Sequence, residues 1–131
     1  MYRPANESRL MEILAEKGYA IAFPERLTLQ QQIYLINKHD MIIGLMGSAL
    51  HGVLFDLSPE ESRNVVCLAE KVSSVDSRVK SYMVIDMIKS VKSTYIFAID
   101  AVQSTDWKVR NEGAVLDLET TLRGLRDLDL L

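Results

Sequence analysis

The 131-residue chain has a single cysteine, no long hydrophobic run and no block of basic residues. One cysteine excludes an intramolecular disulfide, and Cys67 lies in the apolar stretch 65–68, which is typical of a buried side chain rather than a nucleophile. No apolar stretch approaches the roughly 20 residues that span a bilayer, and the N-terminus does not resemble a signal peptide. These absences predict a cytoplasmic chain, or the cytoplasmic part of a larger protein, without a membrane span of its own.

The charges are mixed and nearly balanced. The 15 basic and 18 acidic residues give a net charge of -3, and basic residues do not alternate with aromatic ones. Nucleic acid is therefore not expected as a partner. Hydrophobic residues make up 48% of the chain, which suits a globular protein. Length and composition together predict a single domain over residues 1–131.

In the first third of the chain, helical and strand patterns alternate. Asn6 is expected to cap a helix that ends at Gly18. Residues 19–23 read as a short strand closed by a proline. Thr28 and Gln31 have the spacing of a capping box, and they open a helix with a predicted buried stripe. That stripe consists of Leu29, Ile33 and Ile36.

The alternation continues in the rest of the chain. Residues 41–45 are apolar throughout, which predicts a central strand covered on both faces. Residues 64–68 and 94–99 are two further expected strands, the second at the sheet edge. Residues 77–90 predict a strongly apolar helix. Residues 102–113, which include Trp107, read as irregular, and a last helix is expected over 115–127.

This order predicts a three-layer α/β fold, with a mostly parallel, Rossmann-like sheet between helices. The pattern begins with a helix, so the strand that would normally precede Asn6 is missing or cut short. We therefore expect a fragment of a longer protein, or a chain that self-associates or pairs with a partner lobe.

A glycine-rich turn follows the strand at 41–45. Gly47, Ser48 and Ala49 stand where an apolar helix begins, and His51 follows within its first turn. Free N–H groups at a helix start attract phosphate, and ligands of open α/β sheets bind at the carboxyl ends of strands. The alternative is a turn that only connects a strand to a helix.

Three motifs in order carry a family resemblance. They are RPANE at residues 3–7, GYAIAFPERLTLQQQI at 18–33 and IIGLMGSALHGVLF at 42–55. Together they resemble the C-terminal part of the family 61 glycosyltransferases, which include proteins of capsular polysaccharide biosynthesis. The resemblance covers residues 3–55. The third motif departs from the family pattern at two positions, with Met46 in place of a histidine and Gly52 in place of an asparagine.

The resemblance implies the donor-binding lobe of a two-lobed, GT-B-like transferase. Its substrates would be a nucleotide sugar and a glycan acceptor, and a lobe outside this chain would hold the acceptor. No catalytic residue is identified, no cofactor is expected, and the lack of a DxD-type motif argues against an obligatory metal. The donor-binding candidates are Arg3, Glu7, Glu25, Gly47, Ser48, Ala49 and His51.

Three of these candidates have a structural alternative of their own. Glu7 is favoured at a helix start by the macrodipole alone, Glu25 can be a solvated loop acid, and His51 can be a helix histidine that only packs or caps. Gln32 and His39 are expected to be structural, and Trp107 is a core or interface anchor more readily than a stacking platform.

Two other functions remain open. One is a non-catalytic module that kept the fold and acts through protein contacts, which the two departures favour. The other is a different small α/β nucleotide-binding domain. In each case the isolated chain is not expected to transfer sugar.

Overall fold

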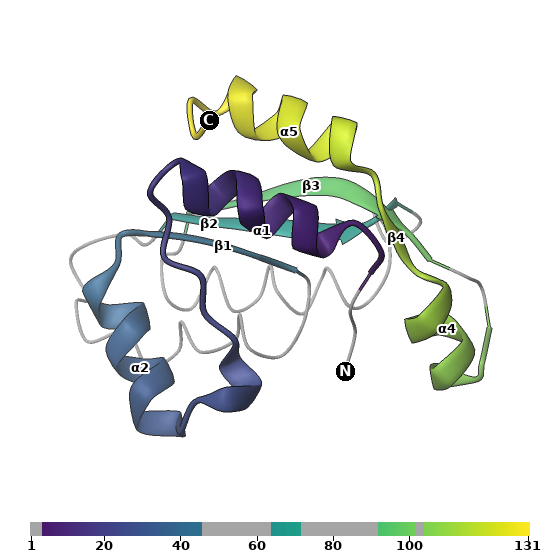
Figure 1. Ribbon diagram of the computed structural model, residues 1–131, viewed down its shortest axis with the longest axis horizontal. Coiled ribbons are helices and arrows are strands. Elements are labelled where there is room, and N and C mark those ends of the chain that lie inside the picture. The colour runs from purple at the N-terminus through teal and green to yellow at the C-terminus, as the bar shows by residue number, and fades with distance from the viewer. Residues whose placement is uncertain (1–3, 46–63, 72–91, 102–103) are drawn as a thin grey trace. The chain divides into compact units, whose positions relative to one another are not determined.

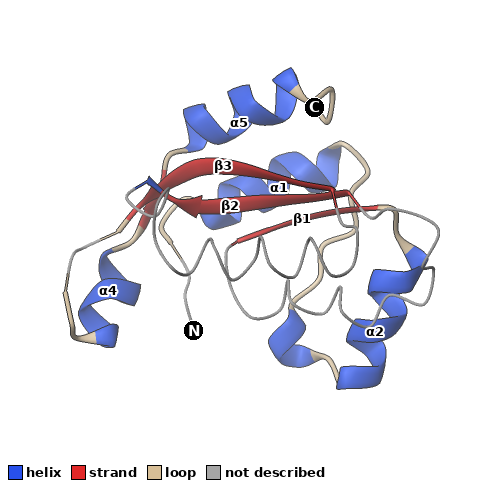
Figure 2. Ribbon diagram, turned by 180° about the vertical axis from the view of Figure 1, so that it is seen from behind, coloured by secondary structure: helices blue, strands red, loops and turns tan. Residues whose placement is uncertain are grey.

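In the computed structural model the described residues are 4–45, 64–71, 92–101 and 104–131. They form a mixed α/β fold whose four-stranded sheet has the hydrogen-bonded order β1-β2-β3-β4. The strands are β1 (Met41–Leu45), β2 (Asn64–Glu70), β3 (Lys92–Asp100) and β4 (Val115–Leu116). Strands β1 and β2 are parallel, whereas β3 and β4 are antiparallel. Figure 2 shows the three long strands running the same way, so the predicted mostly parallel sheet is confirmed.

The chain divides into two compact units. The first contains α1 (Glu7–Glu16), α4 (Trp107–Gly113), β4 and α5 (Leu118–Asp127), together with the ends of β2 and β3. The second contains the 3-10 turn η1 (Pro24–Arg26), α2 (Leu29–Lys38), β1 and most of β2. The expectation of a single domain over 1–131 is not tested by this division.

Helix α1 forms as its sequence predicts. Leu10 and Leu14 lie one turn apart and are buried. The helix ends in a Schellman motif, because Gly18 takes the left-handed conformation (φ 94°) and the amide of Tyr19 donates to the Leu14 carbonyl. Tyr19 is therefore part of a helix cap. Residues 19–23 form no strand in the described structure, and that prediction is wrong.

Helix α5 packs on β3 in the first unit (Figure 1). Its Gly124 lies against the side chain of Ile96, at a position where any Cβ would be only 2.8 Å from Cδ1. The absence of a side chain allows helix and strand to approach closely. The buried residues of β3, β4 and α5 in this unit include Ala98, Ile99, Leu116, Thr121 and Leu125.

Helix α2 has the predicted capping box. The Thr28 hydroxyl accepts a hydrogen bond from the Gln31 amide, and the Gln31 side chain accepts one from the Thr28 amide. Its predicted core stripe is wrong, because α2 has no buried residue and Leu29 is 60% exposed. A capping box fixes where a helix starts but not which face meets a core.

Strand β1 is present where expected, but it is neither central nor fully covered. Among the described strands it is last in the sheet order, and its five residues are half-buried. Strand β2 is the buried strand, since Val65 to Glu70 are all buried, and the single cysteine lies there as predicted. Strand β3 was expected at the edge but has β2 and β4 as neighbours.

The remaining predictions have mixed outcomes. Residues 107–113 form the helix α4, capped by Asp106, so the irregular segment predicted there is wrong in part. The last helix is confirmed, with β4 ahead of it.

The expected helix at 77–90 lies outside the described residues. Directly before Asn6, Ala5 forms one parallel bridge with Val115, and residues 1–3 lie outside the described residues. No helix among the described residues is long and apolar enough to cross a membrane.

Candidate functional site

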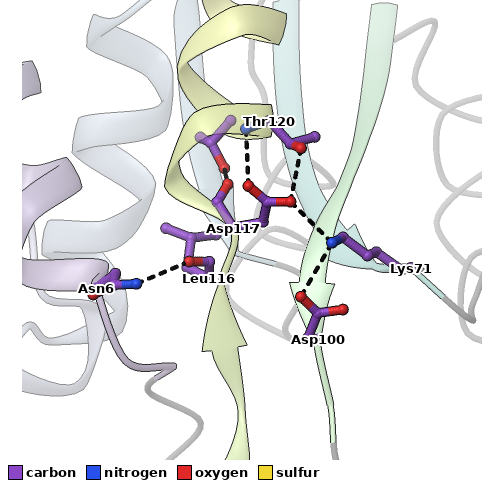
Figure 3. A network of polar contacts seen from close by, with 7 residues as sticks. Asn6, Lys71, Asp100, Leu116, Asp117 and Thr120 are labelled. Atoms are coloured by element: carbon purple, nitrogen blue, oxygen red, sulfur yellow. Dashed lines mark hydrogen bonds and ion pairs between the residues drawn. The ribbon is translucent and has the colours of Figure 1, made fainter.

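A lysine clamped between two carboxylates lies where β2 and β3 end, within the first unit. The Nζ atom of Lys71 is 2.9 Å from Asp117 Oδ2 and 3.1 Å from Asp100 Oδ2 (Figure 3). The side chain of Lys71 is 38% exposed, that of Asp117 is 28% exposed and that of Asp100 is 59% exposed. We call Lys71, Asp100 and Asp117 the lysine clamp.

Asp117 has a second role at the start of α5. Its Oδ1 accepts a hydrogen bond from the Thr120 amide (3.0 Å), and its Oδ2 accepts one from the Thr120 hydroxyl (2.8 Å). The Thr120 amide, the Lys71 ammonium and the Thr120 hydroxyl hold the pKa of Asp117 well below its usual range. Hydrogen bonds to Asp117 and Asp100 raise the pKa of Lys71 above its ordinary value. Lys71 and Asp117 therefore both stay charged at neutral pH.

The residue before the clamp carries a buried carboxyl group. Glu70 ends β2 and is 2% exposed. In an open α/β sheet the carboxyl ends of parallel strands are the edge at which ligands bind. Glu70 and Lys71 were missed by sequence reasoning, although an acid and a base directly after an apolar strand are a usable signal.

Asn6 connects the start of α1 to the same region. Its Nδ2 donates a 3.2 Å hydrogen bond to the carbonyl of Leu116, the residue before Asp117. Ala5 makes two backbone hydrogen bonds of 2.9 Å. Its amide donates to the Ala114 carbonyl, and its carbonyl accepts from the Leu116 amide. Ala5 and Asn6 of this motif are therefore tied to residues 114–116.

The donor-binding candidates are only partly described. Glu7 is the first residue of α1 and half-buried, in the first unit. Glu25 lies in η1 and is exposed, in the second unit. The other five candidates lie outside the described residues: Arg3, Gly47, Ser48, Ala49 and His51. Met46 and Gly52 lie outside as well.

Two residues expected to be structural have structural contacts. The Gln32 amide donates to the carbonyls of Pro24 and Leu27, so it fastens η1 to α2. His39 follows α2, and its Nδ1 lies 3.0 Å from the Leu35 carbonyl. Trp107 begins α4. Among the described residues no group of three or more His, Cys, Asp or Glu side chains is arranged to hold a metal ion.

The described helices and strands define a mixed α/β domain with a mostly parallel sheet. The sequence model for glycosyltransferase 61 matches residues 2–67, half of the chain. The chain therefore belongs to the glycosyltransferase 61 family, as its motifs predicted. No curated protein and no solved structure gave a significant match. The match ends within β2, so the lysine clamp lies beyond the matched residues.

Proposed function

We propose that this chain binds the nucleotide-sugar donor of a glycosyl transfer reaction, as a Rossmann-like donor lobe of a GT-B-like enzyme. The family match over residues 2–67 carries the proposal, because all three motifs fall inside it. The pathway we propose is cytoplasmic synthesis of a capsular or other exported polysaccharide.

The chemistry of the donor supports this role. Glycosyl transfer releases a nucleoside diphosphate, whose developing charge needs hydrogen-bond donors or cations. The glycine turn at 47–49 follows β1, a strand parallel to its neighbour β2. Backbone N–H groups after such a strand suit a diphosphate. Arg3 offers a bidentate phosphate contact, and His51 a further polar one.

Two acids are proposed for the nucleoside. Glu7 begins α1 beside the segment tied to β4, and a half-buried carboxylate there can accept both ribose hydroxyls. Glu25, in the turn before α2, is proposed as a second contact. Acceptor binding is proposed to belong to a lobe outside this chain. The isolated chain should therefore not transfer sugar, because donor and acceptor are not held together.

Calorimetric titration with nucleoside diphosphates and nucleotide sugars tests the proposal. We expect saturable binding of a nucleoside diphosphate, and none of the free sugar. Glu7→Gln should weaken binding about tenfold, since a charged hydrogen bond is lost. Glu12→Gln is the matched control, because Glu12 lies on the same helix in an exposed pair with Arg9. Absence of nucleotide binding, or equal losses in both variants, would contradict the proposal.

A non-catalytic module acting through protein contacts is the second candidate function. Met46 and Gly52 favour it, because the family pattern has a histidine and an asparagine at those positions. This module would have kept the fold and lost donor binding. The same titration separates the two functions, since only the first requires nucleotide affinity.

A further inference from the structure

Asn6 combines an uncommon backbone conformation with an unexpected side-chain contact. Its φ of 72° and ψ of -1° lie in the left-handed region, which residues other than glycine rarely adopt, although asparagine does so more often than most. Asparagine is a preferred N-cap residue, yet the side chain of Asn6 makes no cap hydrogen bond to α1. Its amide instead reaches Leu116, 110 residues further along the chain.

The neighbouring contacts explain why this conformation persists. Ala5 exchanges two backbone hydrogen bonds with Ala114 and Leu116, and Asn6 adds the side-chain bond to the Leu116 carbonyl. Ala114 and Leu116 are buried and held in the core of the first unit. A strained residue persists where its surroundings over-determine it, and here three hydrogen bonds do so.

The conformation of Asn6 determines where the next residue, Glu7, is placed. Asn6 turns the chain directly from the bridge with β4 into α1, and its carbonyl accepts the Leu10 amide at 3.2 Å. The contacts of Ala5 and Asn6 therefore fix where α1 begins, and Glu7 is its first residue. Leu116 continues into Asp117, which belongs to the lysine clamp. The start of α1 and the clamp share one segment of backbone.

We infer that Asn6 is a positioning residue of the donor site: it contacts no ligand and holds Glu7 in place through Leu116. The inference rests on the proposed function. It also assigns a role in donor binding to residues 114–116, which lie beyond the family match at 2–67. A purely structural role would instead affect stability alone.

Asn6→Gly separates the two roles. Glycine adopts φ 72° without strain, so relief of strain offsets the lost hydrogen bond and the melting temperature stays near that of the parent. Binding of uridine diphosphate should nonetheless weaken about tenfold, since Glu7 is no longer held. Asn6→Asp is the second variant. Aspartate tolerates the same backbone conformation, but its carboxylate cannot donate to the Leu116 carbonyl and would repel it. This variant should weaken binding at least as much.

Gly18→Ala is the matched control. It strains the opposite end of α1 and lowers stability, and it should leave the affinity for uridine diphosphate unchanged. Affinity lost in both Asn6 variants but kept in the control supports the inference. Parental affinity in the Asn6 variants, or an equal loss in the control, overturns it while the proposed function stands. A parent chain that binds no nucleotide overturns the proposed function, and the inference with it.

Discussion

The hydroxyl of Tyr19 donates a 2.9 Å hydrogen bond to the carbonyl of Leu130. This bond joins the C-terminal ends of α1 and α5, which have the same capping motif. Tyr19 and Leu130 each close a Schellman motif, with amides donating to Leu14 and Leu125, respectively. The left-handed residue is Gly18 at the end of α1 but Asp129 at the end of α5. The two caps also line an open hollow of about 340 Å³.

Replacing Gly18 by alanine should destabilise the chain by about 1–2 kcal/mol, the cost of a left-handed conformation with a Cβ. Among the described residues nothing lies within 4 Å of the added Cβ, so the expected loss comes from backbone strain. Thermal unfolding measures the loss. An unchanged melting temperature would show that the end of α1 does not need the left-handed conformation.

Replacing Asp129 by glycine should have the opposite effect. Glycine removes the strain at φ 57°, although it also loosens the unfolded chain. We expect a net gain of about 0.5 kcal/mol, because C′ strongly favours glycine. Chemical denaturation measures it. A loss of stability would mean that the Asp129 side chain contributes more than its backbone costs.

Gly124→Ala tests the contact of α5 with β3. The added Cβ would be 2.8 Å from Ile96 Cδ1 and 3.3 Å from two further Ile96 atoms. Overpacking of about 1–3 kcal/mol should outweigh the gain of about 1 kcal/mol in helix propensity. In an Ile96→Val background, which lacks Cδ1, the same change should become neutral or stabilising. Additive effects in this double-mutant cycle would contradict the close approach.

The lysine clamp should make stability depend on pH in the acid range. Because the pKa of Asp117 is lowered on folding, its contribution is present above about pH 3.9 and is lost as pH falls below that value. Asp117→Asn keeps a good N-cap residue but loses the charge. The difference in melting temperature between parent and variant should therefore be largest near neutral pH and shrink below about pH 4.

Asp127→Asn is the control for the clamp, because it removes the same charge from the exposed last turn of α5. Its effect should vary little with pH. A difference for Asp117→Asn that stays constant between pH 7 and pH 3 would show that the charge of Asp117 does not stabilise the fold.

Local features were predictable from the sequence. Gly18 and the Thr28–Gln31 pair act within one helical turn, so their roles can be deduced from spacing alone. The family was predictable for the same reason, because its motifs are short and ordered. Gln32 and Cys67 were also placed correctly, the first in a local contact and the second in a buried strand.

Features that depend on distant contacts were not predictable. Apolar content suggested that β1 is central, but strand order depends on pairing across the chain, and β2 is the covered strand. The clamp joins Lys71 to residues 29 and 46 positions away. Asn6 was correctly placed at the start of α1, but nothing local indicates that its amide reaches Leu116.

Titration of the parent and of Gly47→Val with uridine diphosphate tests donor binding most directly. A valine side chain at position 47 should block the approach of a diphosphate to the backbone, and the unchanged Tm of the variant would verify its fold. We predict saturable binding by the parent and none by Gly47→Val. A parent that does not bind, or a folded variant that binds as the parent does, would contradict a nucleotide-sugar site at the glycine turn.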